Sequence, residues 1–323
     1  MNDEISASGP LPHLGLLRFT GADAAGFLQG QLSNDTRRLS SGSPLLAAYS
    51  SPQGRVIALM HLLPHSSGII ALMPRDLVAP TLDRLRKFIL RAKVQLADLS
   101  DQFSVLGHHG AEGLAAANLP RPATNGYSEL DGIGIARVGH SDARFWVIGE
   151  AQRLASRLPS APATPSGATQ SLERAWRLAD IREGLPQIYP PTQELFVAQM
   201  LNLDLIDGIS FTKGCFTGQE IIARTQHLGR IKRRMFHLRL PAGNWTIGQP
   251  VKLSDGRTGR LIEVARSGDS TEVLAVLNLA NGADARAGVG AVAPGTPSNA
   301  EIEAEAAGDS VEATVLPLPY SLS

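Results

Sequence analysis

The residues with the clearest chemical potential form one stretch, K-G-C-F-T-G-Q-E-I-I-A-R, at residues 213 to 224. Cys215 in this stretch is the single cysteine among 323 residues. Positive charge nearby favours the thiolate, which is the form of cysteine that attacks electrophiles and binds metals. Lys213 precedes the thiol by two residues, and Arg224 and Arg230 follow it. The sequence therefore predicts an electropositive setting for a reactive thiol.

Glycines flank this cysteine on both sides. Gly214 and Gly218 predict a tight backbone turn that exposes Cys215 rather than burying it. The residues from Gln219 onward can begin a helix, and the free amide groups at a helix N-terminus also favour a thiolate.

The residues alone leave three interpretations of the thiol open. A cysteine hydrolase or acyltransferase would need a histidine base, for which His227 and His237 are available. A metal or cluster site could take one ligand from this thiol, because one cysteine cannot build a closed cysteine-rich site. The third interpretation is a small residue that fills a turn. A phosphate-binding loop is excluded, because the order G-x-x-x-x-G-K-[ST] is missing.

Three segments carry helical signals. Residues 75–96 place apolar side chains at spacings of four, three and four. Within residues 171–186, Leu172, Ala175, Trp176 and Ala179 share a face, and Gly184 and Pro186 close the end. Residues 21–39 predict a further helix. Gly26 and Gly30 weaken that helix, which fits either a close approach of another segment to its backbone or loose packing of the helix.

Strand signals lie between and after these helices. Residues 45–63 predict two strands joined by a Ser-Pro-Gln-Gly turn, so the first part of the chain mixes helix and strand. Helical periodicity ends near residue 235, and alternating runs with an Asp-Gly turn follow. We therefore predict an α+β chain with one region at residues 1–234 and a small C-terminal β-barrel domain at residues 235–323.

The composition limits the classes of partner. There are 30 Lys and Arg residues against 30 Asp and Glu residues, so net charge gives no reason to expect a polyanion or a membrane surface as partner. No apolar run approaches the roughly 18 residues that span a bilayer, and no leader peptide is apparent at the N-terminus. A single cysteine forms no internal disulfide, which is typical of a reducing compartment. We expect a cytoplasmic protein without a membrane partner.

Four segments of the chain resemble a known family. They are TGADAAGFLQGQLSNDT, REGLPQIYPPTQELFVAQMLNL, QMLNLDLIDGISFTKGCFTGQEIIARTQHLGRIKRR and the closing PLPYSLS. Together they are similar to the YgfZ proteins, a branch of the folate-binding aminomethyltransferase-like superfamily, over essentially the whole chain. The resemblance is most specific around the thiol, where the pattern is K-G-C-[FY]-x-G-Q-E.

The resemblance implies a fold and a role. The fold is an aminomethyltransferase-like cloverleaf of mixed α/β subdomains around a folate cavity, ending in a small β-barrel. The role is to support the assembly, repair or activity of iron–sulfur enzymes, including those that modify tRNA, with tetrahydrofolate or a one-carbon derivative as ligand. Iron–sulfur enzymes or cluster-assembly proteins are the implied partners. The implied functional thiol is Cys215, and its motif neighbours are Lys213, Gly214, Gly218, Gln219 and Glu220.

The resemblance also suggests residues that bind folate. Trp176 aligns with a folate-contacting position of the family, although its place on an apolar helix face also suits a core residue. Glu194 and Gln199 are expected to face the pterin ring, which has donors along its edge. Arg224 and Arg230 are expected to hold the glutamate carboxylate. No resident metal site is implied.

Two features bear on the type of activity. Where the glycine-cleavage aminomethyltransferase has an acidic residue, this chain has Ala58 and Leu59, and neither can transfer a proton. Glycine cleavage is therefore not expected, and the protein is not expected to be a classical enzyme. A folate-dependent aminomethyl or methyl transferase is the alternative. The basic run R-I-K-R-R at residues 230–234 makes too small a footprint to predict direct tRNA binding.

Overall fold

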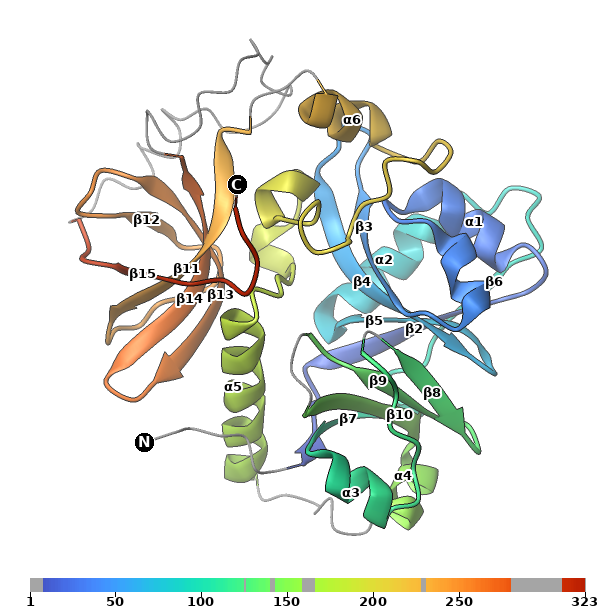
Figure 1. Ribbon diagram of the computed structural model, residues 1–323. Helices are drawn as coiled ribbons and strands as arrows, with labels where there is room; N and C mark the ends of the chain where they lie inside the picture. The colour runs from blue at the N-terminus through green and yellow to red at the C-terminus, as the bar shows by residue number, and fades with distance from the viewer. Residues whose placement is uncertain are drawn as a thin grey trace. The chain divides into compact units, whose positions relative to one another are not determined.

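The computed structural model describes residues 8–124, 126–139, 143–158, 166–227, 231–279 and 310–322, with only the backbone of residues 166–168 (Figure 1). The chain forms two compact units. The first unit contains residues 1–29, 35–47 and 60–176, and the second unit contains residues 30–34, 48–59 and 177–323. No helix in the described ranges is both long and apolar enough to cross a bilayer.

Three antiparallel sheets supply the strands, and helices accompany two of them, so the predicted mixture of helix and strand is confirmed. One five-stranded sheet has the order β3-β4-β5-β2-β6. Helix α2 packs on β2, β5 and β6 through buried side chains that include Leu77, Val78 and Leu85. The bounds of this part are β2 Leu14–Thr20, α1 Ala24–Gln31, the 3-10 helix η1 Thr36–Ser41, β3 Leu45–Ser50, β4 Val56–His65, β5 Gly68–Pro74, α2 Arg75–Arg86 and β6 Gln95–Asp98.

A second sheet, of order β1-β7-β10-β9-β8, lies wholly in the first unit. Helices α3 and α4 cover one of its faces (Figure 1), where Leu114 and Leu154 join a buried cluster with Phe145 and Val147. The elements are β1 Gly9–Pro10, β7 Phe103–His109, α3 Ala111–Ala116, β8 Tyr127–Leu130, β9 Ile133–Arg137, β10 Arg144–Glu150 and α4 Ala151–Arg157.

Helix α5, Ser166–Arg182, links the two units along the chain, and short helical turns follow it. The helix ends before Gly184, whose amide donates to the carbonyl of Ile181, in agreement with the predicted end. The remaining helical elements are η2 Pro190–Thr192, η3 Ala198–Leu201 and α6 Gln219–His227.

In the C-terminal part, residues 231–279 and 310–322 form strands without helices, as predicted. Its sheet has the order β12-β13-β14-β11-β15 and encloses a core that includes Leu238, Leu261 and Val273. The predicted barrel is not closed by these ladders. One isolated parallel bridge, between Leu253 and Val311, connects the two edges of the sheet. The strands are β11 Arg233–Pro241, β12 Pro250–Lys252, β13 Thr258–Ser267, β14 Ser270–Asn278 and β15 Thr314–Leu316.

Three local predictions can be compared with the structure. The hairpin of β3 and β4 around the Ser-Pro-Gln-Gly turn is confirmed, and the amide of Gly54 donates to the carbonyl of Ser51. The helix predicted over residues 75–96 ends at Arg86, because residues 95–98 pair with β2 as an edge strand. The domain boundary near residue 235 stays a prediction, although it falls within two residues of the start of β11 at Arg233.

Candidate functional site

The thiol lies on a loop of the second unit just before helix α6. Cys215 is a free cysteine with an exposed side chain, as the flanking glycines predicted. Helix α6 begins four residues later at Gln219, so the predicted helix after the thiol is confirmed. The side chain of Gln219 accepts a hydrogen bond from the amide of Phe216 at 3.2 Å and closes the turn that leads into the helix. Glu220 lies exposed in the first helical turn, where a negative charge interacts favourably with the helix dipole.

Lys213 anchors this loop through buried hydrogen bonds. Its side chain is buried, and its ammonium group donates to the carbonyl oxygens of Leu32 at 2.6 Å and Asn34 at 3.1 Å. The same ammonium group lies 4.7 Å from the centre of the Phe216 ring. The sequence suggested that Lys213 supplies positive charge to the thiol. In the structure its donors serve the backbone of residues 32–34 instead.

Ser33 and Asn34, which sequence reasoning did not select, extend this anchorage. The hydroxyl of Ser33 donates to the carbonyl of Gly208 at 2.7 Å and accepts from the amide of Ala48 at 2.8 Å. The side-chain amide of Asn34 donates to the carbonyl of Asp207 at 2.6 Å. The sequence placed both residues inside the helix predicted over residues 21–39, whereas α1 ends at Gln31, so no local signal marked these buried contacts.

Glycine is required at one side of the thiol and not at the other. Gly218 has a φ of +83°, and a Cβ atom there would lie 2.7 Å from the carbonyl oxygen of Ser51 and 2.9 Å from Cα of Gly54. Gly54 has a φ of +71°, and its own Cβ would lie 2.9 Å from that of Ile221. The hairpin turn therefore packs directly on the thiol loop. At Gly214 a Cβ would meet no atom within 4 Å.

The predicted close approach at helix α1 takes a different form. Side-chain positions at Gly26 and Gly30 are open, with no atom within 4 Å of a Cβ placed there. The backbone of Gly30 nevertheless contacts the thiol loop, because its carbonyl accepts a hydrogen bond from the amide of Thr217 at 3.2 Å.

A buried polar layer in the second unit contacts helix α6. Gln199 is fully buried, and its side-chain nitrogen donates to the carbonyl of Ile222 at 2.7 Å. Its side-chain oxygen has no hydrogen-bond partner among the described residues. The guanidinium of Arg234 donates to the backbone carbonyl of Gln199 at 2.8 Å and pairs with Asp204. Arg233 is also buried, and its Nε donates to Asn278.

Arg55 stands at the end of the hairpin turn and was not among the predicted site residues. Its side chain is 4% exposed, and Nη1 donates to the carbonyl of Leu195 at 2.8 Å. Its Nε and Nη2 atoms have no partner in the described part of the chain. Burial lowers the pKa of Arg55, the positive charge of Arg233 lowers it further, and the carboxylate of Glu194 opposes both effects.

The two other predicted folate residues on this side are Arg224 and Arg230. Arg224 is exposed in the last turn of α6. Arg230 lies outside the described residues.

Trp176 belongs to the first unit. Its side chain is fully buried, and the guanidinium of Arg144 lies 4.6 Å from the centre of its ring. The ring fills the space beside Gly107, where a Cβ atom would lie 2.6 Å from it. Trp146 is directly opposite Gly107 in the β7–β10 ladder, so the two residues face the same side of the sheet. The indole nitrogens of Trp176 and Trp146 have no partner among the described residues.

His61 completes this aromatic cluster. Its ring makes an edge contact with Trp146, with 4.7 Å between the ring centres. Burial lowers the pKa of His61 to about 4, so the ring is neutral at physiological pH. The aromatic cluster is therefore defined by His61, Trp146 and Trp176, with Arg144 against the last of them.

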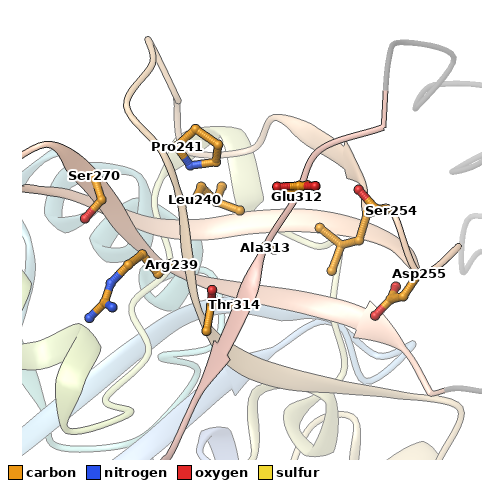
Figure 2. Close-up of a pocket in the computed structure, with 10 residues that line it drawn as sticks. Arg239, Leu240, Pro241, Ser254, Asp255, Ser270, Glu312, Ala313 and Thr314 are labelled. Carbon is orange, nitrogen blue, oxygen red and sulfur yellow. The ribbon is translucent and has the colours of Figure 1, made fainter.

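One open cavity of about 480 Å³ lies in the C-terminal sheet (Figure 2). Its polar side chains include Arg239 at one end and Asp255 and Glu312 at the other. None of the predicted site residues lines it. Asp255 is already bonded to Arg257, which lowers its pKa.

The chain is similar in sequence to proteins of known family. The tRNA-modifying protein YgfZ of Colwellia psychrerythraea is 31% identical over 253 residues, which are 76% of this chain and 74% of that protein. The tRNA-modifying protein YgfZ of Yersinia pseudotuberculosis serotype O:1b is 29% identical over 325 residues, covering 95% of this chain and 90% of that protein. No family model matches the chain.

A solved structure shares the fold. The glycine cleavage system aminomethyltransferase T from Bartonella henselae superposes with a TM-score of 0.60 at 14% identity, over 84% of this chain and 78% of that one. The predicted aminomethyltransferase-like fold is thus confirmed, while the cloverleaf arrangement stays a prediction.

Proposed function

The chain belongs to the YgfZ family, and on that premise we propose that it is a folate-binding protein that supports the assembly, repair or activity of iron–sulfur enzymes. Tetrahydrofolate or a one-carbon derivative is the proposed ligand, and the thiol of Cys215 is the proposed functional group. Because the relatives are named tRNA-modifying proteins, the iron–sulfur enzymes that modify tRNA are among the proposed partners. The proposal places the protein in the cytoplasm, since its one cysteine forms no internal disulfide.

The observation that carries this proposal is an exposed thiol on an anchored loop. Cys215 is exposed, whereas Lys213 beside it is buried and bonded to two carbonyls. Thr217 is bonded to Gly30, and Gly218 packs on the hairpin turn. A reactive group that is accessible and held by its supporting residues can meet a partner protein or a cluster without first being ordered.

The polar groups of the second unit fit a pterin. A pterin ring carries hydrogen-bond donors and acceptors along one edge and therefore needs both kinds of partner. The second unit offers unpartnered donors on Arg55 and an unpartnered acceptor on Gln199 among the described residues, and Glu194 adds a carboxylate. Folate would supply a carrier for one-carbon units. Trp176 stays the proposed aromatic contact, and Arg224 and Arg230 stay the proposed partners of the glutamate tail.

Two observations favour a supporting role over the alternatives. Ala58 and Leu59 are both fully buried and apolar, so a folate-dependent aminomethyl transfer would have no proton donor or acceptor at that position. Arg233 and Arg234, from the basic run, donate to Asn278 and Asp204. Those two side chains are therefore committed to internal partners, and we propose that the link to tRNA passes through the modifying enzymes.

The experiment that tests this function replaces the thiol. In cells that lack the native protein, Cys215→Ser is expected to abolish support of an iron–sulfur enzyme that methylthiolates tRNA, measured as loss of the modified nucleoside. The matched control is Thr212→Ala, an exposed position on the same loop, which is expected to restore the modification fully. Full restoration by Cys215→Ser would contradict the role of the thiol.

A further inference from the structure

The strongest unused feature of the molecule is the guanidinium of Arg55. The side chain is 4% exposed, yet two of its three nitrogens have no hydrogen-bond partner among the described residues. Burying a charged group without partners is costly, and natural structures rarely leave such groups unexplained. Arg55 therefore calls for a partner beyond the residues that the structure describes.

The backbone around Arg55 fixes where this side chain lies. Residues 55 and 197 form a β-bridge, and the amides of Val56 and Glu194 bond to the carbonyls of Phe196 and Val56. The preceding turn is held by the contact of Gly54 with Gly218 and Ile221. The guanidinium is tied to this frame by its bond to the carbonyl of Leu195. It cannot turn towards solvent without breaking these contacts.

The charges nearby narrow the class of partner. Glu194 lies close enough for its carboxylate to act on the charge of Arg55, and Arg233 lies close enough to oppose it. A carboxylate or phosphate ligand would be attracted by the guanidinium and repelled by Glu194. A neutral ring that presents acceptors beside donors suits the charges of both side chains, because the guanidinium only donates and the carboxylate only accepts.

We propose that Arg55 donates hydrogen bonds to the oxygen on the edge of the pterin ring, beside the N–H groups of the ring that donate to Glu194. This inference rests on the proposed function, since it names a further binding residue for the same ligand. Nη1 stays bonded to Leu195, and Nε and Nη2 donate hydrogen bonds to the ring. Arg55 thereby selects a hydrogen-bond acceptor at this position of the ring, and the glutamate tail binds elsewhere.

The test compares three chains by calorimetric titration with tetrahydrofolate. Arg55→Met keeps an unbranched apolar stem and removes the guanidinium, and Arg239→Met makes the same change at an exposed position of the second unit. Loss of hydrogen bonds from a charged group is expected to weaken binding about 10- to 100-fold in Arg55→Met. Arg239→Met is expected to bind as the native chain does. Equal affinity in the native chain and Arg55→Met would overturn this inference alone.

Thermal unfolding without ligand provides a second readout. Replacing an unpaired buried charge by an apolar group of similar volume is stabilising, so the melting temperature of Arg55→Met is expected to rise by about 2 °C or more. A lower melting temperature, or a chain that fails to fold, would show that Arg55 has a structural partner and would overturn the inference.

Fragments of the ligand show whether Arg55 bonds to the pterin ring or to the glutamate tail. A tetrahydropterin without the tail should lose affinity in Arg55→Met, whereas p-aminobenzoylglutamate should bind both chains equally. The reverse result would assign Arg55 to the tail and overturn the inference. If the native chain binds no tetrahydrofolate, the proposed function fails and this inference fails with it.

Discussion

The thiol loop and the aromatic cluster are both marked by the sequence, and they differ in how their functional groups are held. In the thiol loop Lys213 is bonded to two backbone carbonyls, and the cysteine side chain is exposed. In the aromatic cluster the side chain of Trp176 is fully buried, and its indole nitrogen has no partner among the described residues. The first region presents an exposed group, and the second buries indole nitrogens that no described residue bonds.

This difference indicates which substitutions should disturb each region. The thiol loop depends on backbone conformation and on two carbonyl contacts, so that changes far from the sulfur should disturb it. The aromatic cluster depends on close packing around a large ring, and closely packed interiors respond to the addition of a single methyl group.

The largest expected effect lies at Gly218. Alanine there would be forced into a positive φ and against the carbonyl of Ser51, so Gly218→Ala is expected to destabilise the protein by about 3 kcal/mol. Urea unfolding measures this change. Gly214→Ala is the matched control in the same loop, where a Cβ is unobstructed, and it should leave stability unchanged. Equal losses in both variants would remove the argument that only one of the two glycines is conformationally required.

The next effect concerns the anchor of the loop. Lys213→Met leaves the carbonyls of Leu32 and Asn34 without their buried donor, and we expect a loss of about 2 kcal/mol. Hydrogen exchange should increase in residues 211–218 before it increases elsewhere. Lys232→Met, at an exposed position, is the control. Native-like exchange in Lys213→Met would show that the loop does not depend on this lysine.

A comparable test of the aromatic cluster is Gly107→Ala. The added methyl group would lie 2.6 Å from the ring of Trp176, and overpacking of this kind costs about 1–2 kcal/mol. Thermal unfolding and tryptophan emission report the change together. Gly26→Ala adds a methyl group to a helix at an open position and should instead stabilise the protein by up to about 1 kcal/mol. A neutral Gly107→Ala would mean that the cluster is looser than its contacts indicate.

The smallest effect is a dependence on pH from His61. Burial lowers the pKa of His61 from 6.5 to about 4, so the unfolded chain binds this proton first as the pH falls. Stability from this residue is present above pH 6.5 and is lost as the pH falls from there towards 4. His61→Phe should flatten this part of a stability–pH profile, whereas replacing the exposed His227 should not. An unchanged slope in His61→Phe would contradict the burial of this ring.

Local patterns predicted the elements that depend on neighbouring residues. The Ser-Pro-Gln-Gly turn, the end of α5 before Gly184 and the helix after Cys215 could all be predicted, because proline, glycine and helical spacing act within a few residues. The predicted helix over residues 75–96 was too long. Ile89, the last apolar position on the helical spacing, lies beyond the end of α2 at Arg86, and its neighbours Phe88 and Leu90 are exposed.

Site residues that depend on distant contacts could not be predicted. Arg55 reads as a polar residue after a turn until its contact with Leu195, which is 140 residues away in the chain. Ser33 likewise bonds to Gly208 across 175 residues. No local pattern encodes such pairs, so the sequence pointed to Cys215 and its motif and not to Ser33 or Arg55.

The central claim is that this chain binds folate beside a functional thiol. The most direct measurement is a calorimetric titration of the native chain and of Cys215→Ser with tetrahydrofolate. The account predicts saturable binding of equal affinity in both, because the thiol acts on partner enzymes and does not hold the ligand. Absence of binding by the native chain up to millimolar folate would contradict the claim.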